Sequence, residues 1–242
     1  MRLELERIPV WDGVRSESEC FVCDLMGEAQ HDAINFYLGP SVMNPETRVR
    51  VNEHGFCTIH WQMLVSANKP QGVSLMGDTY LSTTREKLSG VIADLSKAKS
   101  KGAARRAVKQ LEEQLKKREK GCLVCTAMEA RLKRYLYTTA YLWDQEEEFV
   151  KALRTSKGFC LHHFMLLLKE GQEAVTPSRY DEFVREMTAL QVENLDRIAK
   201  DLHWMTQMYK SENREKDWNG SEDAHRRGVD KMIGRHRLID PV

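Results

Sequence analysis

The residues best suited to chemistry in this chain are its six cysteines and two of its eight histidines, and they form a repeated pattern. Two Cys-x-x-Cys pairs, ECFVC and GCLVC, are each followed after 33 or 34 residues by Gly-Phe-Cys-x-x-His, first as GFCTIH and then as GFCLHH. The copies are offset by 102 residues for the cysteine pairs and by 103 for the second motif. This internal duplication predicts two similar modules in one chain.

The duplication also decides between the two adjacent histidines of GFCLHH. In the first copy, Ile59 stands where the second has His162, and His60 stands where the second has His163. His163 is therefore the motif histidine. We expect His162 to lie at the surface or to be partly packed.

Three cysteines and one histidine form a Cys₃His set, which is a standard tetrahedral shell for zinc. Two-residue gaps let both side chains of a pair reach one ion, and positions i and i+3 share one face of a helix. A filled shell leaves no open position for a substrate, which argues against zinc catalysis. We expect the repeats to be used in order, with one ion on Cys20, Cys23, Cys57 and His60 and a second on Cys122, Cys125, Cys160 and His163.

Three other interpretations of the same cysteines stay open. A Cys-x-x-Cys pair can cycle between dithiol and disulfide, although the thioredoxin type needs a βαβ context that the sequence does not suggest. An iron–sulfur cluster usually has three closely bunched cysteines, which this chain lacks. A single site shared by both Cys-x-x-Cys pairs is the third, and the repeated set of four makes it unnecessary.

Composition limits the class of protein. The chain has 242 residues, of which 41% are hydrophobic, 30% charged and 8% aromatic, and its formal net charge is +1. These values favour a helix-rich protein with a substantial core. The start of the chain, MRLELERIPVWDG, has no apolar signal region, and no run approaches 18 apolar residues. We therefore expect a cytoplasmic protein, where six cysteines are not used as structural disulfides.

Helical periodicity and chain breaks predict an all-α fold, a long-helix bundle with two pseudo-repeated Cys₃His zinc-knuckle modules. A short helix capped by Ser221 is expected in the polar tail. We divide the chain into four segments of one integrated domain: a first module (1–70), a helical hairpin connector (71–120), a second module (121–170), and a long helix with the polar tail (171–242). The expected helices are 24–38, 46–54, 57–67, 71–98, a helix around 104–115, and one of about 35 residues that begins near Thr176-Pro177.

The stretch 97–120 is strongly basic, with ten lysines and arginines against three glutamates. It predicts either a nucleic-acid-binding stripe or a solvated helix face. The lack of interleaved aromatic residues favours the solvated face.

Several segments resemble an uncharacterised family of bacterial proteins, the domain of unknown function numbered six thousand and sixty-two. They are IPVWDG, CFVCDLM, LGPSVMNPETRVRVNEHGFC, the second CLVC with GFCLHH, and KDWNGSEDAHRRGV. The likeness covers nearly the whole chain; one departure is Phe21, where the family pattern has a proline after the first cysteine. The resemblance implies a cytosolic bacterial protein of this length with two metal-type motifs, and it implies no activity.

The sequence thus favours a zinc-stabilised helical binding or adaptor protein with two Zn²⁺ per chain. Its partner is an unknown protein or ligand, a homodimer is one arrangement that the long helices allow, and no membrane association is expected. The alternatives are a thiol-redox or iron–sulfur protein, and a nucleic-acid-binding protein that uses 97–120. No catalytic residue emerges from the sequence, which leaves open whether the chain is an enzyme.

Overall fold

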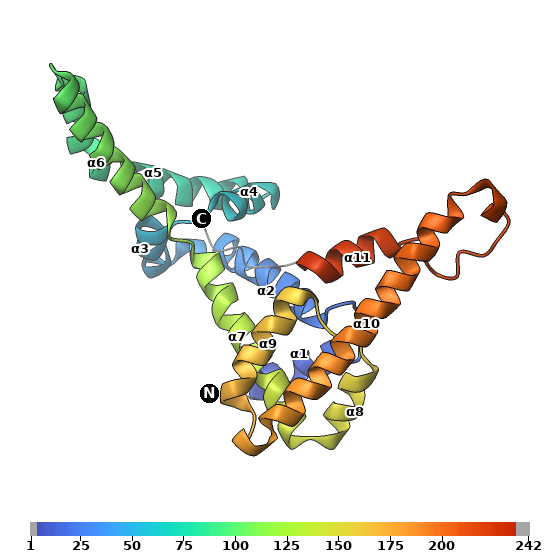
Figure 1. Ribbon diagram of the computed structural model, residues 1–242. Helices are drawn as coiled ribbons and strands as arrows, with labels where there is room; N and C mark the ends of the chain where they lie inside the picture. Colours follow the sequence, from blue (N-terminus) through green and yellow to red (C-terminus); the bar gives the residue numbers. More distant parts are fainter. Residues whose placement is uncertain (1–3, 236–242) are drawn as a thin grey trace. The chain divides into compact units, whose positions relative to one another are not determined.

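The computed structural model describes residues 4–235, and the regular secondary structure of this part of the chain is all helical, as the sequence predicts. None of its helices is both long and apolar enough to cross a membrane. Figure 1 shows the α-helices in chain order: α1 (Glu4–Val14), α2 (Phe21–Leu38), α3 (Pro45–His54), α4 (Thr58–Ser66), α5 (Pro70–Lys97), α6 (Lys101–Glu119), α7 (Leu123–Gln145), α8 (Glu147–Thr155), α9 (Leu161–Ala174), α10 (Tyr180–Met208) and α11 (Ala224–Ile233). Three short 3₁₀ turns, η1 (Pro40–Met43), η2 (Pro177–Arg179) and η3 (Ser211–Asn213), join them.

The described residues form two compact units. The inserted unit is Gln30–Glu129, and the terminal unit is made of the residues before and after it. Two helices contribute to both units: α2 begins in the terminal unit, and α7 begins in the inserted unit. Each of these helices starts at one of the Cys-x-x-Cys pairs.

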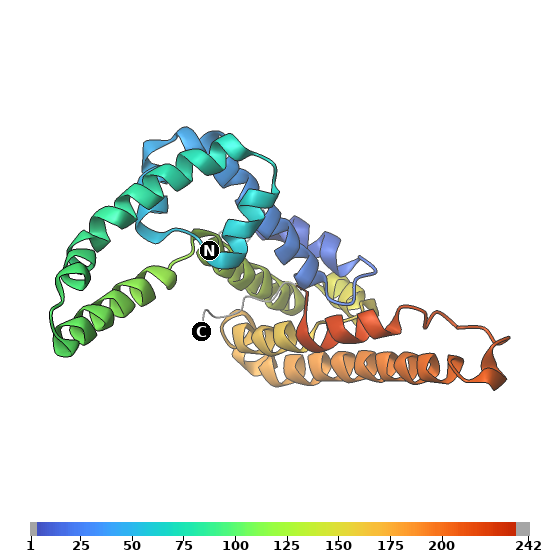
Figure 2. The same ribbon diagram turned by 90° about the horizontal axis from the view of Figure 1, so that it is seen from above.

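The inserted unit has an aromatic core at the foot of a long helical hairpin. Tyr37, Phe56, Trp61 and Tyr80 pack in sequence with ring centroids 4.9–5.4 Å apart. Helices α5 and α6 lie side by side as the hairpin (Figure 2). The guanidinium of Arg118 stacks 3.8 Å from the centroid of the Tyr80 ring and ties the end of α6 to α5.

The terminal unit is built around α10, which packs against α9 and α11. Trp143 and Phe183 are buried in its core with ring centroids 5.0 Å apart, and Phe21 packs on Phe159 at 5.3 Å. Because Phe21 and Phe159 each adjoin a motif cysteine, this core sets the position of the cysteines.

Most expected helices are present, and one expected cap is wrong. The helix after Thr176-Pro177 begins as the 3₁₀ turn η2 and continues as α10. Ser221 does not cap the tail helix: its hydroxyl donates to the Trp218 carbonyl at 2.7 Å, and Asp223 occupies the N-cap position of α11. The turn 218–221 satisfies this serine locally, two residues before the cap position.

Candidate metal centres

The eight residues predicted as ligands come together in two groups, each with three cysteines and one histidine. Within each group the donor atoms all lie within 4.8 Å of one another. We call them the terminal centre and the inserted centre after the unit that contains each. The terminal centre consists of Cys20, Cys23, Cys160 and His163, and the inserted centre consists of Cys57, His60, Cys122 and Cys125.

The expected pairing of the motifs is wrong, because each Cys-x-x-Cys pair meets the Cys-x-x-His of the other copy. Helix length explains the exchange. Helix α2 has 18 residues and carries the chain about 27 Å from Cys20, whereas α3, with 10 residues, spans only about 15 Å. Cys57 instead lies beside Cys122 and Cys125 at the start of α7, within the inserted unit.

Both centres are made from two helix N-termini. Cys160 and Cys57 are the N-cap residues of α9 and α4, while Cys20 and Cys122 directly precede α2 and α7. The positive ends of two helix dipoles thus point at each group of sulfurs, which favours thiolates there.

The glycine of each Gly-Phe-Cys motif turns the chain into its centre. Gly55 has φ +64° and Gly158 has φ +70°, in the left-handed region that favours glycine. The Gly55 carbonyl then accepts a hydrogen bond from the Leu123 amide at 3.1 Å and so joins the two halves of the inserted centre. A side chain on Gly55 would also meet Tyr80, whose hydroxyl lies 2.5 Å from the ideal Cβ position.

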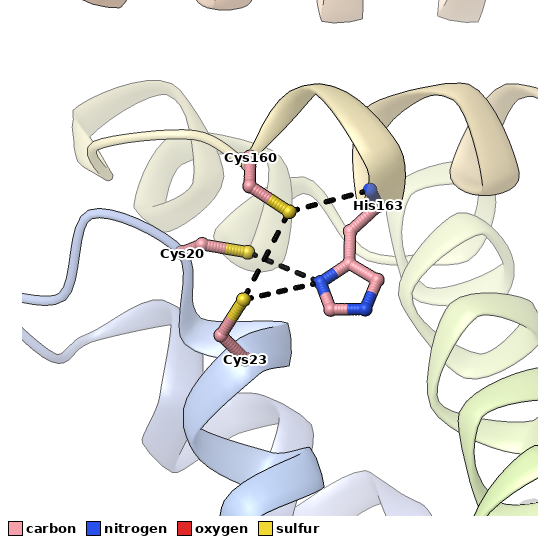
Figure 3. Close-up of side chains that lie close together, drawn as sticks. All are labelled: Cys20, Cys23, Cys160 and His163. Atoms are coloured by element: carbon pink, nitrogen blue, oxygen red, sulfur yellow. Dashed lines mark hydrogen bonds between the residues drawn. The ribbon is translucent and has the colours of Figure 1, made fainter. Parts of the chain in front are cut away.

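Distances in the terminal centre suit a four-coordinate ion (Figure 3). Zinc with ordinary bond lengths places two sulfur ligands about 3.8 Å apart and a sulfur about 3.5 Å from a nitrogen. Here the Sγ atoms of Cys23 and Cys160 are 3.8 Å apart, and His163 Nδ1 lies 3.4 Å from the Sγ atoms of both Cys20 and Cys23. The site therefore has the shape and the donor chemistry of a tetrahedral thiolate–imidazole centre.

The inserted centre has the same dimensions. His60 Nδ1 lies 3.2 Å, 3.3 Å and 3.4 Å from the Sγ atoms of Cys57, Cys122 and Cys125, respectively. The Sγ atoms of Cys57 and Cys125 are 3.9 Å apart. Two independent sets of residues thus reach one tetrahedral geometry.

The close packing of the thiols shifts their pKa values in opposite directions within each group. A hydrogen bond from Cys125 is the main cause that lowers the pKa of Cys122 to about 3, and the same bond raises the pKa of Cys125 well above its ordinary value. In the terminal centre, burial and the neighbouring thiols raise the pKa of Cys20, while hydrogen bonds from Cys160 and Cys20 lower that of Cys23. Packed thiols thus favour one thiolate and oppose a second, whereas a cation would stabilise all three.

The two histidines differ at the nitrogen that faces away from the cysteines. If Nδ1 binds an ion, Nε2 carries the proton and needs an acceptor. The side-chain amide nitrogen of Gln30 lies 3.0 Å from His60 Nε2. Turning this amide by 180° places its oxygen at that position, where it accepts the proton. His163 Nε2 is buried and has no hydrogen-bond partner among the described residues. Only the inserted centre therefore has a group that fixes the orientation of its imidazole by hydrogen bonding.

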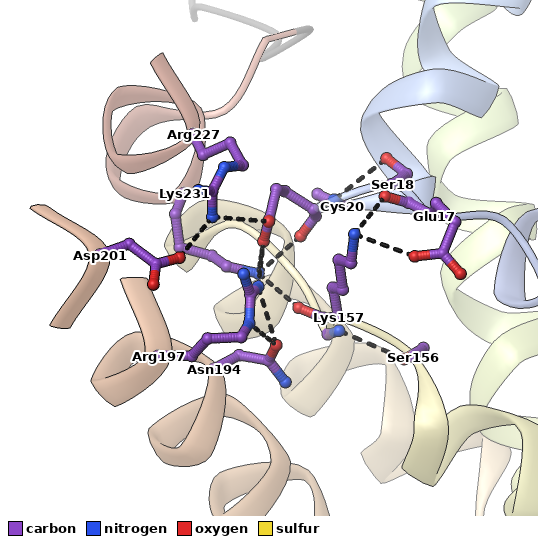
Figure 4. A network of polar contacts seen from close by, with 12 residues as sticks. Glu17, Ser18, Cys20, Ser156, Lys157, Asn194, Arg197, Asp201, Arg227 and Lys231 are labelled. Carbon is purple, nitrogen blue, oxygen red and sulfur yellow. Dashed lines mark hydrogen bonds and ion pairs between the residues drawn. The ribbon is translucent and has the colours of Figure 1, made fainter. Parts of the chain in front are cut away.

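A buried lysine joins the two halves of the terminal centre (Figure 4). The Lys231 side chain, on α11, is fully buried, and its ammonium donates to the backbone carbonyls of Glu19 (2.6 Å) and Lys157. It also pairs with the Glu19 carboxylate at 3.3 Å. Burial lowers the pKa of Lys231, and the Glu19 carboxylate opposes this effect. Since Glu19 precedes Cys20 and Lys157 lies three residues before Cys160, the ammonium contacts the chain on both sides of the centre.

The residues after α11 complete the cover over the terminal centre. The Arg235 amide donates to Cys23 Sγ at 3.4 Å, and Arg235 also pairs with Asp24. A Cβ atom on Gly234 would lie 3.0 Å from Cys160 Sγ, so the backbone itself packs against the sulfurs. All four residues of this centre are buried, whereas Cys57 and Cys125 of the inserted centre are only half-buried.

His162 lies outside both groups, as predicted. It is half-buried, and its ring centroid is 5.5 Å from that of His163. Reasoning from sequence missed Lys231, Glu19 and Gln30. The one usable signal was the spacing of Ala224, Gly228 and Lys231, which places two small residues and a lysine on one helix face and permits close packing there.

The fold and the paired donor sets define a helical protein with two candidate Cys₃His metal centres. The chain belongs to the family of unknown function DUF6062, whose family model matches residues 1–238. The family predicted from the sequence motifs is therefore confirmed. No curated protein and no solved structure matches this chain.

Proposed function

We propose that this is a cytoplasmic, zinc-stabilised binding or adaptor protein with one structural Zn²⁺ in each centre. The observation that carries the proposal is the double tetrahedral geometry, in which two sets of three sulfurs and one Nδ1 atom have the spacing of a closed zinc shell. Zinc is favoured over calcium or magnesium because the donors are sulfur and nitrogen rather than oxygen.

A binding role is favoured over catalysis by the coordination and by the rest of the described chain. Four protein ligands leave a zinc ion no open position for substrate. The described residues contain no third cluster of histidine, cysteine and acidic side chains that could serve as a separate metal site.

The hairpin of α5 and α6 is the surface that we propose for a partner protein or a second copy of the chain. A two-helix layer can bury only one face of each helix, and Ala107 is the one fully buried side chain of α6. Leu81 is 69% exposed and Val108 is 54% exposed, so apolar area stays uncovered on both helices. A partner that covers these side chains would bury apolar area and so gain binding free energy.

Metal analysis of protein purified without oxygen tests this function directly. We expect two zinc ions per chain and loss of helical signal when a strong chelator removes them. Iron with acid-labile sulfide would contradict the proposal in favour of a cluster protein. A metal-free protein whose cysteine pairs cycle reversibly with a glutathione-range potential would favour the thiol-redox alternative.

One observation favours a second candidate function, binding to a nucleic-acid backbone. Lys101, Arg105, Lys109, Lys116 and Lys120 are all exposed and recur at spacings that keep them on one face of α6. Glu113 and Glu112 pair with only two of them, Lys109 and Lys116. If this row binds phosphates, affinity for duplex RNA or DNA falls steeply with added salt, and glutamate at positions 101, 105 and 109 abolishes binding. Absent binding at low salt would dismiss this function.

A further inference from the structure

We propose that Cys57 and Cys125 of the inserted centre form a peroxide-sensitive pair, oxidised to a disulfide as the centre releases its zinc. This inference rests on the proposed zinc function and adds a modification site and a class of reactant, the hydroperoxides. Three observations together point to these two sulfurs: access, hydrogen bonding and proximity.

The first observation is access. Cys57 and Cys125 are half-buried, whereas Cys122 and all three cysteines of the terminal centre are buried. The residues that follow them are exposed as well, among them Ile59 with 54% of its surface accessible. A small oxidant therefore reaches these two residues more readily than the buried cysteines, and susceptibility to oxidation rises with exposure.

The second observation is hydrogen bonding to sulfur. Backbone amides donate to Cys23 and Cys160 in the terminal centre and to Cys122 in the inserted centre, each at 3.4 Å. Within the described residues, no backbone amide donates to the sulfur of Cys57 or Cys125. Cys20 also lacks an amide donor among these residues, but it is buried. An amide hydrogen withdraws electron density from a thiolate, so Cys57 and Cys125 are the stronger nucleophiles within the inserted centre.

The third observation is proximity. The Sγ atoms of Cys57 and Cys125 are 3.9 Å apart, and the two residues stand at the beginnings of α4 and α7. A disulfide needs a separation of about 2.05 Å, so the two sulfurs have to approach by a little under 2 Å once no ion separates them. The other partner in reach, Cys122, is buried and accepts the Cys125 amide.

The reaction is balanced with one hydroperoxide. One thiolate attacks a peroxide oxygen, the O–O bond breaks, and with one proton a sulfenic acid and water form when the oxidant is hydrogen peroxide. The second thiolate attacks the sulfenic sulfur, the S–O bond breaks, and the leaving hydroxide takes up a second proton to become water. Sulfur loses two electrons, peroxide gains them, and zinc leaves as Zn²⁺ without a change of oxidation state.

Loss of this ion acts on the hairpin. Helix α4 leads into α5, and α6 ends immediately before Cys122, so the inserted centre holds both ends of the α5–α6 segment. With the disulfide formed, His60 and Cys122 no longer bind a common ion. The Cys57–Cys125 disulfide is then the remaining link at the centre between the two ends of the hairpin. Peroxide would thereby change the surface that we propose for the partner.

The test uses the full chain after metal analysis has established two zinc ions, which separates failure of this inference from failure of the zinc function. Hydrogen peroxide is added, zinc release is followed with a chromogenic chelator, and disulfides are mapped by peptide mass spectrometry without reduction. We expect one zinc ion to leave roughly tenfold or more faster than the other, together with a Cys57–Cys125 disulfide. A dithiol with added zinc should restore the starting state.

Matched variants keep the outcome clear. In Cys160→Ser, which removes a ligand from the terminal centre, the fast phase and the Cys57–Cys125 disulfide should persist. In Cys125→Ser the fast phase should be lost. Simultaneous release of both ions, faster release from the terminal centre, or a dominant disulfide between any other cysteines would overturn the inference.

Discussion

The terminal and inserted centres share a donor set, a tetrahedral geometry and a construction from two helix N-termini, yet they differ in what surrounds them. The terminal centre is fully buried, with Lys231, Gly234 and Arg235 packed around it. The inserted centre has two half-buried sulfurs and a glutamine on its histidine. The short motif thus specifies the ligands, whereas distant residues specify how stable and how accessible each centre is.

The largest losses of zinc and of helical structure are expected in double variants that test which cysteine motifs share a centre. Cys23→Ser with Cys160→Ser removes ligands from one centre and should leave one zinc ion, whereas Cys23→Ser with Cys57→Ser should leave none. Since a structural zinc site contributes about 10–16 kcal/mol, loss of one should unfold the unit that contains it. Zinc content and helical circular dichroism measure both effects.

The neighbouring histidines supply the control for this test. His162→Ala should keep both ions and full helicity, while His163→Ala should lose one ion. Retention of one ion by Cys23→Ser with Cys57→Ser would show instead that the motifs pair in the order of the repeat.

The next largest effect should fall on the terminal centre alone. Lys231→Met leaves two backbone carbonyls without their ammonium donor, while the Glu19 carboxylate keeps its ion pair with Arg197. A buried acceptor left unpaired costs about 1–3 kcal/mol. We expect faster zinc release from the terminal centre and unchanged release from the inserted centre, as measured with a chelator. Lys200→Met, at an exposed lysine of the same unit, is the matched control and should change neither rate.

A smaller difference, in the free energy of unfolding, is expected between alanine variants of the two motif glycines, Gly55 and Gly158. Both have a positive φ, so alanine at either position costs about 1–3 kcal/mol in backbone strain. Gly55→Ala adds a clash with Tyr80, whereas a Cβ on Gly158 has 3.5 Å to its nearest neighbour. Urea denaturation with zinc present should therefore show Gly55→Ala to be the more destabilising change, and equal losses would mean that Tyr80 moves aside.

The smallest change in stability should come from Gln30→Ala. Removing a hydrogen-bond partner from a metal-binding histidine typically weakens metal binding about 10–100-fold while the fold persists. Competition with a chelator of known affinity should show this loss at the inserted centre only. Weakening at both centres would indicate a general loss of structure rather than an effect on His60.

The sequence predicted the helical class, most helix positions and all eight residues of the two centres, because these depend on local periodicity and on repeated motifs. It did not predict which motifs meet. That outcome depends on how far α2 and α3 carry the chain between Cys23 and Cys57. A repeated motif is by itself compatible with either pairing. The same limit applies to Lys231, whose contacts with Glu19 and Lys157 bring together residues far apart in the chain.

The polar tail shows most clearly that contacts between distant residues cannot be predicted from local sequence. The sequence predicts only a short helix in this segment, and α11 carries exposed Met232 and Ile233. The side of α11 that carries Ala224, Gly228 and Lys231 is nevertheless buried. A buried lysine in a polar segment has no local signature, since only its acceptors explain its burial.

The exchanged pairing has a consequence for biosynthesis. In the terminal centre, the first cysteine pair lies 137 residues or more before Cys160, whereas all the cysteines of the inserted centre lie within 68 residues. At about 5–20 residues per second, a ribosome delivers His163 several seconds after Cys125 is made. During that interval the inserted centre can bind its zinc ion. Early in synthesis, Cys57 and His60 are the only motif residues that could take the places of Cys160 and His163 beside Cys20 and Cys23. Rapid closure of the inserted centre removes those competitors and keeps the first cysteine pair available for its native partners.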